Sequence, residues 1–289
     1  MAQDTQTWLV TGAATGFGRA IAERALSVGH NVVITARNPS RVNDLVAKYR
    51  AAAFAVPLDV ADPDQVSEAV RQAEAHFSGP IDVVVNAAGY NFLGAVEEVS
   101  DKELRDLMET HFFGVVNMIK AALPGMRSRG RGHFFNFSST AGLRGAPGTY
   151  AYSAAKFAVE GLSESLAAEV ALLGIKVTIL QPGPFQTSFF AGPGGQLSAT
   201  VMAEYADVTR VYRELVSNPP TWCPGDPERA AAEIVGLAMR DDAPLRLPLG
   251  KMAHYVARSA HRDRLTEVES FKEVSLSLDF PECAGRTWP

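Results

Sequence analysis

Cysteine is scarce in this chain of 289 residues. Only Cys223 and Cys283 occur, and neither belongs to a CxxC pair or to a Cys/His cluster. We therefore expect neither a disulfide framework nor a structural zinc site. The six histidines are scattered without the spacing of metal ligands, so we also predict no metal. This cysteine usage fits the reducing cytoplasm.

Long apolar runs and an excess of positive charge are missing as well. No apolar segment approaches the roughly 18 residues that a membrane-spanning helix needs, and the first residues, MAQDTQ, are polar. The formal net charge of -5 gives no attraction to nucleic acid or to an anionic membrane. We therefore expect a soluble, unprocessed protein that acts on a small molecule.

A GxSxG sequence is also absent. In α/β-hydrolases this sequence forms the sharp turn that exposes the nucleophilic serine. Hydroxyls, histidines and carboxylates are available in the chain, but without that turn we exclude a hydrolase of this type.

The chain does contain a regular alternation of short β-branched runs and longer amphipathic segments. The predicted strands are TWLVT, NVVIT, FAVPLD, IDVVVN, GHFFNFS, IKVTIL and, near the end, LRLPLG. The predicted helices between them span residues 17–29, 39–50, 63–78, 101–127 and about 152–173. Strands that are apolar throughout and alternate with helices form parallel sheets covered on both faces. The sequence thus predicts an α/β protein with a doubly wound parallel sheet, the Rossmann fold.

We expect a single domain over residues 1–289. Residues 5–190 form its cofactor-binding and catalytic core. After the sixth predicted strand, residues 184–222 form an insertion that we interpret as a lid over the substrate, with glycines at 192, 194 and 195 that allow it to move. Residues 245–289 hold the last strand and a C-terminal extension, with a helix within 251–276.

The segment LVTGAATGFGRA, residues 9–20, places three glycines between the first strand and the first helix. Gly12 allows a tight turn, Gly16 lets backbone amides approach a ligand, and Gly18 lets the helix pack closely on the sheet. The helix N-terminus then offers unpaired N–H groups to an anion, most simply a dinucleotide pyrophosphate. The spacing is GxxxGxG, which differs from the more common GxGxxG.

Tyr152 and Lys156 stand four residues apart at the start of a predicted helix, so both side chains lie on one face near its N-terminus. A tyrosine has a pKa of about 10. A neighbouring ammonium, the helix N-terminus and an oxidised nicotinamide are expected to lower that pKa toward the working pH. We predict that Tyr152 protonates a carbonyl oxygen on reduction, or removes a hydroxyl proton on oxidation. Tyr150 lacks such a lysine and is interpreted as packing or pocket lining.

The second predicted strand continues into TARN. An acidic residue at its end would bind the ribose hydroxyls of NAD, but Ala36 stands there and Arg37 follows. The guanidinium of Arg37 suits the 2′-phosphate of NADP, and a solvated surface arginine is the alternative. We therefore expect NADP(H), with NAD(H) less favoured.

Aromatic residues gather after the sixth predicted strand and are candidates for the wall of an apolar pocket. Core packing is the alternative for each of them. The segment contains Phe185, Phe189, Phe190, Tyr205, Tyr212 and Trp222. The predicted substrate-contacting residues are Tyr90, Phe92, Leu143, Phe189 and Phe190.

Five motifs resemble, in order and spacing, those of the short-chain dehydrogenase/reductases. They are TGAATGFG, NAAG at 86–89, SS at 138–139, YSAAK at 152–156 and PGPFQT at 182–187. The resemblance is close over residues 5–190 and loose beyond, and it points to a member similar to carbonyl reductases and hydroxysteroid dehydrogenases. It implies a nicotinamide cofactor and a homodimer or homotetramer that associates through the helices predicted at 101–127 and 152–173.

The resemblance also implies roles for individual residues. Ser139, thirteen residues before Tyr152, would hold the substrate oxygen, with capping of the strand end as the alternative. Asp59 and Val60 would meet the adenine, and a helix-terminal charge is the alternative for Asp59. The implied cofactor-binding residues are Gly12, Thr15, Gly16, Phe17, Gly18, Arg37, Asp59, Val60, Asn86, Gly89, Tyr152, Lys156, Pro182, Gly183, Phe185 and Thr187. The last motif would receive the nicotinamide amide, and the second asparagine common in NAAG is Ala87 here.

The chain departs from the family pattern in METHFFGVVN, where the usual asparagine is His111. In the family that asparagine stabilises a helix irregularity and holds water that links the catalytic lysine to solvent. A neutral histidine has one donor and one acceptor and can hold the same water. With Lys156 as a cationic neighbour we expect His111 to stay neutral. The alternative is a histidine that only packs beside Phe112.

These observations predict an NADP(H)-dependent carbonyl reductase or alcohol dehydrogenase for a medium-sized ketone, aldehyde or secondary alcohol. Its catalytic residues would be Ser139, Tyr152, Lys156 and His111. One alternative is an NAD-preferring dehydrogenase similar to hydroxysteroid or retinol dehydrogenases. Another, from a different class, is a dinucleotide-sensing protein without turnover, against which the presence of Ser139, Tyr152 and Lys156 argues.

Overall fold

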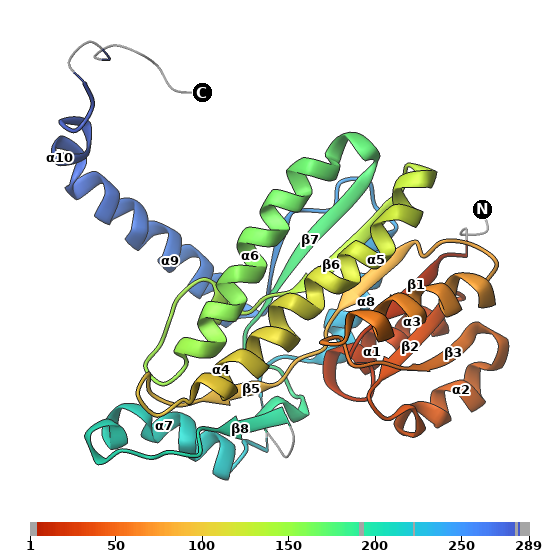
Figure 1. Ribbon diagram of the computed structural model, residues 1–289, viewed down its shortest axis with the longest axis horizontal. Coiled ribbons are helices and arrows are strands. Elements are labelled where there is room, and N and C mark those ends of the chain that lie inside the picture. Colours follow the sequence, from red (N-terminus) through yellow and green to blue (C-terminus); the bar gives the residue numbers. More distant parts are fainter. Residues whose placement is uncertain (1–4, 191–193, 222, 281–282, 284–289) are drawn as a thin grey trace.

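A computed structural model describes residues 5–190, 194–221, 223–280 and 283. Its centre is a twisted parallel sheet, as the sequence predicts (Figure 1). The spatial order of the strands is β3-β2-β1-β4-β6-β7-β9. Their bounds are β1 (Thr7–Val10), β2 (Asn31–Ala36), β3 (Ala53–Pro57), β4 (Val83–Asn86), β6 (Gly132–Phe137), β7 (Ile175–Pro182) and β9 (Arg246–Leu249). The α/β Rossmann-type fold is therefore confirmed.

Helices cover both faces of this sheet, because the strands are apolar on both sides. On one face Ile21, Leu45 and Ile234 pack against strand residues such as Trp8 and Phe135. On the other face a second core forms around Leu9, Val84 and Phe134. The helices of the first face are α1 (Gly16–Ser27), α2 (Asn43–Tyr49) and α8 (Pro227–Ala238), and those of the second are α3 (Pro63–His76), α5 (Gly114–Arg129) and α6 (Tyr150–Val170).

Local sequence signals set the ends of several helices. Asp62 caps α3 by accepting from the N–H groups of Asp64 and Gln65, and Pro63 occupies the first turn. Ser100 and Glu103 form a reciprocal capping box at the start of α4 (Asp101–Met108). Gly174 adopts φ +69° where the chain leaves α6 for β7, as expected of a glycine after a helix.

The segment predicted as one helix over 101–127 is divided in three. Between α4 and α5 the chain forms a π-helical turn, Glu109–Phe113, whose middle residue is His111. Such turns are rare and are frequent at functional sites. The irregularity that the family resemblance implied for this helix is thus present in the chain.

The strand order reverses between β1 and β4, the adjacent strands at which the two halves of the sheet meet. From β1 the chain builds outward through β2 to β3 on one side, and from β4 it builds outward through β6, β7 and β9 on the other. In open α/β sheets, the crevice at this point and at the carboxyl ends of the strands is where ligands bind. The segments after β1, β4, β6 and β7 therefore meet along one edge of the sheet, and they carry four of the five motifs. The fifth, YSAAK, lies in the first turns of α6.

The insertion after β7 contains regular secondary structure. It contains a short strand, β8 (Gly195–Leu197), that pairs with β5 (Asn91–Leu93), followed by α7 (Ala206–Ser217). Neither short strand was predicted, because three residues carry too little alternation to be recognised. Gly192 and Trp222, named in the sequence prediction, lie outside the described residues.

The C-terminal extension consists of α9 (Lys251–Ser270) and α10 (Lys272–Leu276) after β9. Figure 1 shows α9 leaving the body of the molecule and carrying α10 away from it. None of the described helices combines the length and the apolar character that crossing a membrane requires.

Candidate active site

The glycine turn after β1 is built by close backbone packing. A Cβ at Gly12, where φ is +66°, would lie 2.8 Å from the Cα of Ala88, and a Cβ at Gly18 would lie 2.6 Å from the carbonyl oxygen of Gly12. Gly16 has φ +55°. Each glycine of GxxxGxG is therefore needed for the role predicted from the sequence: Gly12 for the turn, Gly16 for the approach of backbone to a ligand and Gly18 for the packing of the helix start.

The N-terminus of α1 opens toward a cavity. Thr15 is its N-cap residue, but the Thr15 side chain makes no capping hydrogen bond. The first N–H groups of the helix thus have no side-chain acceptor, and together with the helix dipole they suit a phosphate. The cavity has a volume of about 500 Å³. Its residues fit a dinucleotide: a glycine-lined helix N-terminus at one end and buried polar side chains further along.

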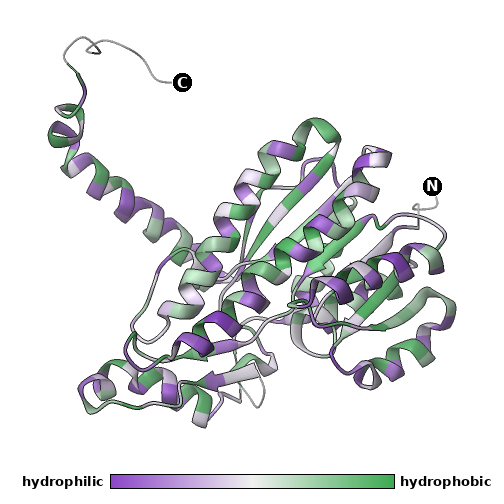
Figure 2. Ribbon diagram, viewed as in Figure 1, coloured by the Kyte–Doolittle hydropathy of each residue, from purple (hydrophilic) through white to green (hydrophobic). Residues whose placement is uncertain are grey.

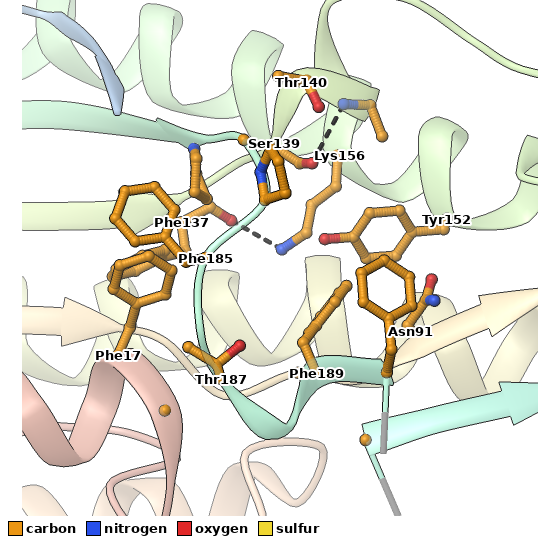
Figure 3. Close-up of a pocket in the computed structure, with 18 of the residues that line it drawn as sticks. Phe17, Asn91, Phe137, Ser139, Thr140, Tyr152, Lys156, Phe185, Thr187 and Phe189 are labelled. Atoms are coloured by element: carbon orange, nitrogen blue, oxygen red, sulfur yellow. Dashed lines mark hydrogen bonds between the residues drawn. The ribbon is translucent and has the colours of Figure 1, made fainter. Parts of the chain in front are cut away.

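The predicted catalytic residues converge on this cavity. Ser139, Tyr152, Lys156 and His111 all line it. Because α6 begins at Tyr150, Tyr152 and Lys156 occupy its first two turns and share one face. In Figure 3 the Tyr152 hydroxyl points toward the ammonium of Lys156. Lys156 Nζ also donates to the carbonyl oxygen of Phe137 at 2.7 Å, where β6 ends.

Ser139 lies two residues after β6 rather than within it. Its Oγ accepts from the N–H of Ala141 at 3.1 Å and caps a short 3-10 turn. The hydroxyl also acts as a hydrogen-bond partner of the Tyr152 phenol. The capping alternative and the predicted site role are thus both compatible with its position.

Burial controls the protonation of this pair. Removal from water raises the pKa of Tyr152 above its usual value, and the hydrogen bond with Ser139 offsets this only in part. Burial also lowers the pKa of Lys156 to about 7. Among the chain's own groups, burial therefore outweighs the lowering of the Tyr152 pKa expected from Lys156, because the Lys156 ammonium is itself desolvated. The contribution expected from an oxidised nicotinamide stays a prediction.

His111 is fully buried beside this pair. Its Nε2 lies 2.8 Å from the carbonyl oxygen of Tyr90, and its ring meets the Tyr152 ring edge-on at a centroid distance of 5.4 Å. Burial, then the nearby Lys156, lowers its pKa well below 6.5, against the effect of the Tyr90 carbonyl. This direction agrees with the expectation that His111 stays neutral, and its Nδ1 is buried with no hydrogen-bond partner among the described residues.

Gly89 makes room for this histidine. A Cβ at position 89 would lie 2.5 Å from the Cε1 atom of His111. The last glycine of NAAG therefore serves the packing of His111 in addition to lining the cavity.

The predicted cofactor-binding residues fall into two groups. Most of them line the cavity: Gly12, Thr15, Gly16, Phe17, Gly18, Gly89, Tyr152, Lys156, Pro182, Gly183, Phe185 and Thr187. The structure places the others outside its lining: Arg37, Asp59, Val60 and Asn86.

The outlying residues still lie near the carboxyl edge of the sheet. Arg37 is exposed directly after β2. Asp59 accepts from the N–H of Ala61, and the helix cap of α3 is Asp62 instead. Asn86 is buried and donates to Asn136 Oδ1 at 2.8 Å, so its amide faces β6.

Val60 has a core position. Its side chain belongs to the apolar cluster under α3 and α5, and its carbonyl oxygen accepts from Asn117. The Val60 side chain therefore packs in the core, and it does not provide the predicted contact with adenine.

Of the predicted substrate residues, Phe189 and Phe190 line the cavity, and the Phe189 ring lies 5.7 Å from the Tyr152 ring. The structure places Tyr90, Phe92 and Leu143 outside that lining. Phe92 is buried in a cluster with Leu107 and Tyr152, and Leu143 packs on α9. For Tyr90, Phe92 and Leu143 the structure thus agrees with the alternative of core packing.

Sequence reasoning missed the contribution of the C-terminal extension to this site. Met252 and Val256, in the first turns of α9, line the cavity, as does Arg144. The signal was available for α9, because a helix that directly follows the last parallel strand begins at the same edge of the sheet as the glycine turn.

The insertion is held over the cavity by a buried ion pair that the sequence did not reveal. Arg213 of α7 donates to Glu98 Oε2 at 2.7 Å, and the Glu98 side chain is wholly buried. Burial raises the pKa of Glu98, but the N–H groups of Ala95 and Met202 and the guanidinium together hold it below its usual value. The wall that carries Tyr212 is therefore anchored to the core by a charged contact.

Comparison with known proteins agrees with this geometry. A family model described as short chain dehydrogenase matches residues 6–193. The chain is 38% identical over 274 residues to oxidoreductase BOA17 of Botryotinia fuckeliana, covering 94% of this chain and 99% of that protein. It is 38% identical over 248 residues to 3-ketodihydrosphingosine reductase of Bacteroides thetaiotaomicron, covering 86% and 88%.

A solved structure is similar over nearly the whole chain. The crystal structure of a short-chain dehydrogenase from Streptomyces avermitilis superposes with a TM-score of 0.89 at 41% sequence identity, covering 96% of this chain and 100% of that one. These likenesses agree with the fold, with the glycine turn and with the pairing of Tyr152 and Lys156. The chain belongs to the short-chain dehydrogenase/reductase family and is an NAD(P)-dependent oxidoreductase.

Proposed function

We propose that the protein is an NADP(H)-dependent carbonyl reductase or alcohol dehydrogenase for a medium-sized, largely apolar ketone, aldehyde or secondary alcohol. The observation that carries this proposal is the convergence of Ser139, Tyr152 and Lys156 in one cavity beside the uncapped N-terminus of α1. The apolar character of the substrate is supported by Phe185, Phe189 and other aromatic side chains in the lining. A relative named for a 3-keto compound supports a ketone.

In the proposed mechanism Ser139 holds the carbonyl oxygen and Tyr152 donates its proton to that oxygen. NADPH, when bound along the glycine turn, would supply the hydride that the carbonyl carbon receives. Because burial keeps the Tyr152 pKa high, the phenol is protonated near neutral pH and is ready to act as an acid. Loss of its proton leaves a phenolate that Lys156, when protonated, stabilises. Oxidation of an alcohol runs through the same groups in reverse.

We propose that Lys156 sets the range in which this exchange works. With a pKa of about 7, it gains or loses its proton near physiological pH. His111 is proposed as a positioning residue next to it: the buried Nδ1, which has no hydrogen-bond partner among the described residues, shares a hydrogen bond with water that connects Lys156 to solvent.

The proposed preference for NADP(H) rests on Arg37. It is exposed at the carboxyl end of β2, next to β1 and its glycine turn, and no acidic residue occupies positions 36–38. A cation at this place attracts a 2′-phosphate, whereas an acid would favour the free ribose hydroxyls of NAD.

Turnover tests the proposal directly. Purified protein is incubated with NADPH and a panel of aliphatic, aromatic and long-chain ketones, and the absorbance of the reduced nicotinamide is followed. We expect oxidation of NADPH with at least one class and removal of this activity, by roughly a hundredfold or more, in Tyr152→Phe, because the phenol proton is lost. The variant should still bind NADPH in a fluorescence titration.

Tyr152→Phe with wild-type turnover would contradict the mechanism. NADPH binding by the wild-type protein with no turnover across the panel would favour the dinucleotide-sensing alternative.

Replacing Arg37 by Asp should reverse the cofactor preference. The substitution removes the phosphate partner and adds repulsion, so we expect the ratio of kcat/KM for NADPH over NADH to fall by at least about thirtyfold. Arg24→Asp, the same charge change on the exposed end of α1 far from the glycine turn, is the matched control and should leave the ratio unchanged. An unchanged ratio in Arg37→Asp would place the 2′-phosphate elsewhere.

Substitution of His111 tests the proposed water contact. His111→Asn keeps a hydrogen-bonding side chain and should retain activity within about tenfold, whereas His111→Leu should lose on the order of a hundredfold. The pH profile of kcat, measured across roughly pH 6 to 9, should shift in the leucine variant if the lysine is uncoupled from solvent. A folded leucine variant with the wild-type rate and profile would mean that His111 only packs.

A further inference from the structure

The helical segment at residues 261–280 contacts the rest of the described protein near its start, where Asp263 forms an ion pair with Arg144 and Arg264 donates to the carbonyl oxygen of Leu143, and it projects beyond that point. We call residues 261–280 the C-terminal arm; it comprises the end of α9, all of α10 and the residues that follow. Each of its twenty residues is exposed. Figure 1 shows the arm projecting from the body of the molecule. Helices of this length draw most of their stability from a packed face, so a helix in this position calls for a covering surface.

The arm carries many large apolar side chains in spite of its exposure. Leu265, Val268 and Phe271 recur at every third residue and so follow one side of the helix. Figure 2 shows hydrophobic and hydrophilic residues interleaved along the arm to its end. The apolar side chains, each 59% to 80% exposed, are Leu265, Val268, Phe271, Val274, Leu276, Leu278 and Phe280. Exposed large apolar side chains in this number mark an interaction site.

Charge is segregated along the same stretch. The base, residues 251–264, carries a net charge of +3 and the remainder, residues 265–280, carries −3. The base contains Lys251, Arg258, Arg262 and Arg264 against Asp263, and the remainder contains Glu267, Glu269, Glu273 and Asp279 against Lys272. A helix with this distribution is complementary to a copy of itself that runs in the opposite direction.

We propose that the C-terminal arm packs against a second copy of this chain, with the two α9 helices antiparallel about a two-fold axis. In this arrangement the acidic part of the arm, residues 265–280, of one copy lies along the basic base, residues 251–264, of the other, and the contact occurs twice. The base also offers apolar surface for the arm: Tyr255 is 69% exposed, and Phe157 of α6 is half-buried beside Arg264. The dipoles of two antiparallel helices point in opposite directions, and this also favours the antiparallel arrangement.

The charges favour a second copy over a lipid surface. Helices that lie on membranes place Lys and Arg around their apolar side chains, because the lipid headgroups are often anionic. In this chain the apolar side chains of the arm stand among Glu267, Glu269 and Glu273. Such a segment is repelled by an anionic membrane but attracted by the basic base of another α9.

The interaction is distinct from the association that the family resemblance implies. That association is expected to use the helices that correspond to α5 and α6. The arm is the C-terminal end of α9 together with α10, and it projects away from the body of the molecule. Loss of the arm contact should therefore lower the association state of the protein without removing its fold or its binding of NADPH.

The first test measures molar mass by light scattering and sedimentation on the full chain. The wild-type protein should be a dimer or a larger assembly, and Leu265→Ser/Val268→Ser/Phe271→Ser should weaken the association by roughly a hundredfold, because apolar contacts are lost on both copies. Val96→Ser/Val201→Ser, which replaces two equally exposed valines elsewhere, is the control and should keep the wild-type mass. Circular dichroism and NADPH binding verify that the variants fold.

A monomeric wild-type protein, or an arm variant with the wild-type mass, would overturn the proposal. An equal loss of association in the control would overturn it as well, since the arm would then have no special part in the contact.

The second test exchanges the charges. Glu267→Lys/Glu269→Lys and Arg258→Glu/Arg262→Glu should each weaken association, by roughly tenfold or more, and their combination should restore it, because the reversed charges again face each other across the two copies. A combination as weak as either pair alone would overturn the antiparallel arrangement. Cosedimentation with phosphatidylcholine/phosphatidylserine vesicles completes the test: vesicle binding that needs the arm apolar residues, with no change of mass, would assign the arm to a membrane instead.

Discussion

The candidate site depends on one hydrogen bond between a helix and a strand. Lys156 is buried, and its ammonium donates to the carbonyl oxygen of Phe137, the last residue of β6. An ammonium removed from water is costly unless it is hydrogen-bonded, and here burial lowers its pKa to about 7. The bond therefore holds the second turn of α6 against the end of β6, and it places Tyr152, one turn earlier, in the cavity.

A series of buried side-chain hydrogen bonds also joins α6 to the sheet. Asn86 of β4 donates to Asn136 of β6, and Asn136 donates to Ser163 of α6 at 2.9 Å. Since unpaired polar groups are costly inside a protein, these hydrogen bonds tie α6 to the two central strands in one register. His111 then closes the remaining side, with its ring edge toward Tyr152. The protonation behaviour of the site follows from this enclosure: burial raises the pKa of the Tyr152 phenol, lowers the pKa of Lys156 to about 7 and lowers the pKa of His111 well below its usual value.

The fold and much of the site could be predicted because they follow from local patterns. Buried β-branched strands alternating with helices specify a parallel sheet, and the glycines at 12, 16 and 18 mark the turn at its switch point. The four-residue spacing of Tyr152 and Lys156 specifies a shared helix face. Pairings between distant short segments could not be predicted: β5 with β8, Glu98 with Arg213, and Met252 with the cavity. The effect of burial on the Tyr152 pKa could not be predicted for a related reason, since burial depends on the whole fold and sequence spacing shows only the neighbouring charge.

The central claim is that burial, rather than the charge of Lys156 alone, determines the chemistry of the site. It is tested most directly by an NMR titration of the protein with ¹⁵N-labelled lysine, in which the Nζ signal of Lys156 is assigned by its loss in Lys156→Met. We predict a midpoint near pH 7 for this residue. A midpoint at the ordinary lysine value of about 10.4 would contradict the account, because the ammonium would then be as well solvated as one on the surface.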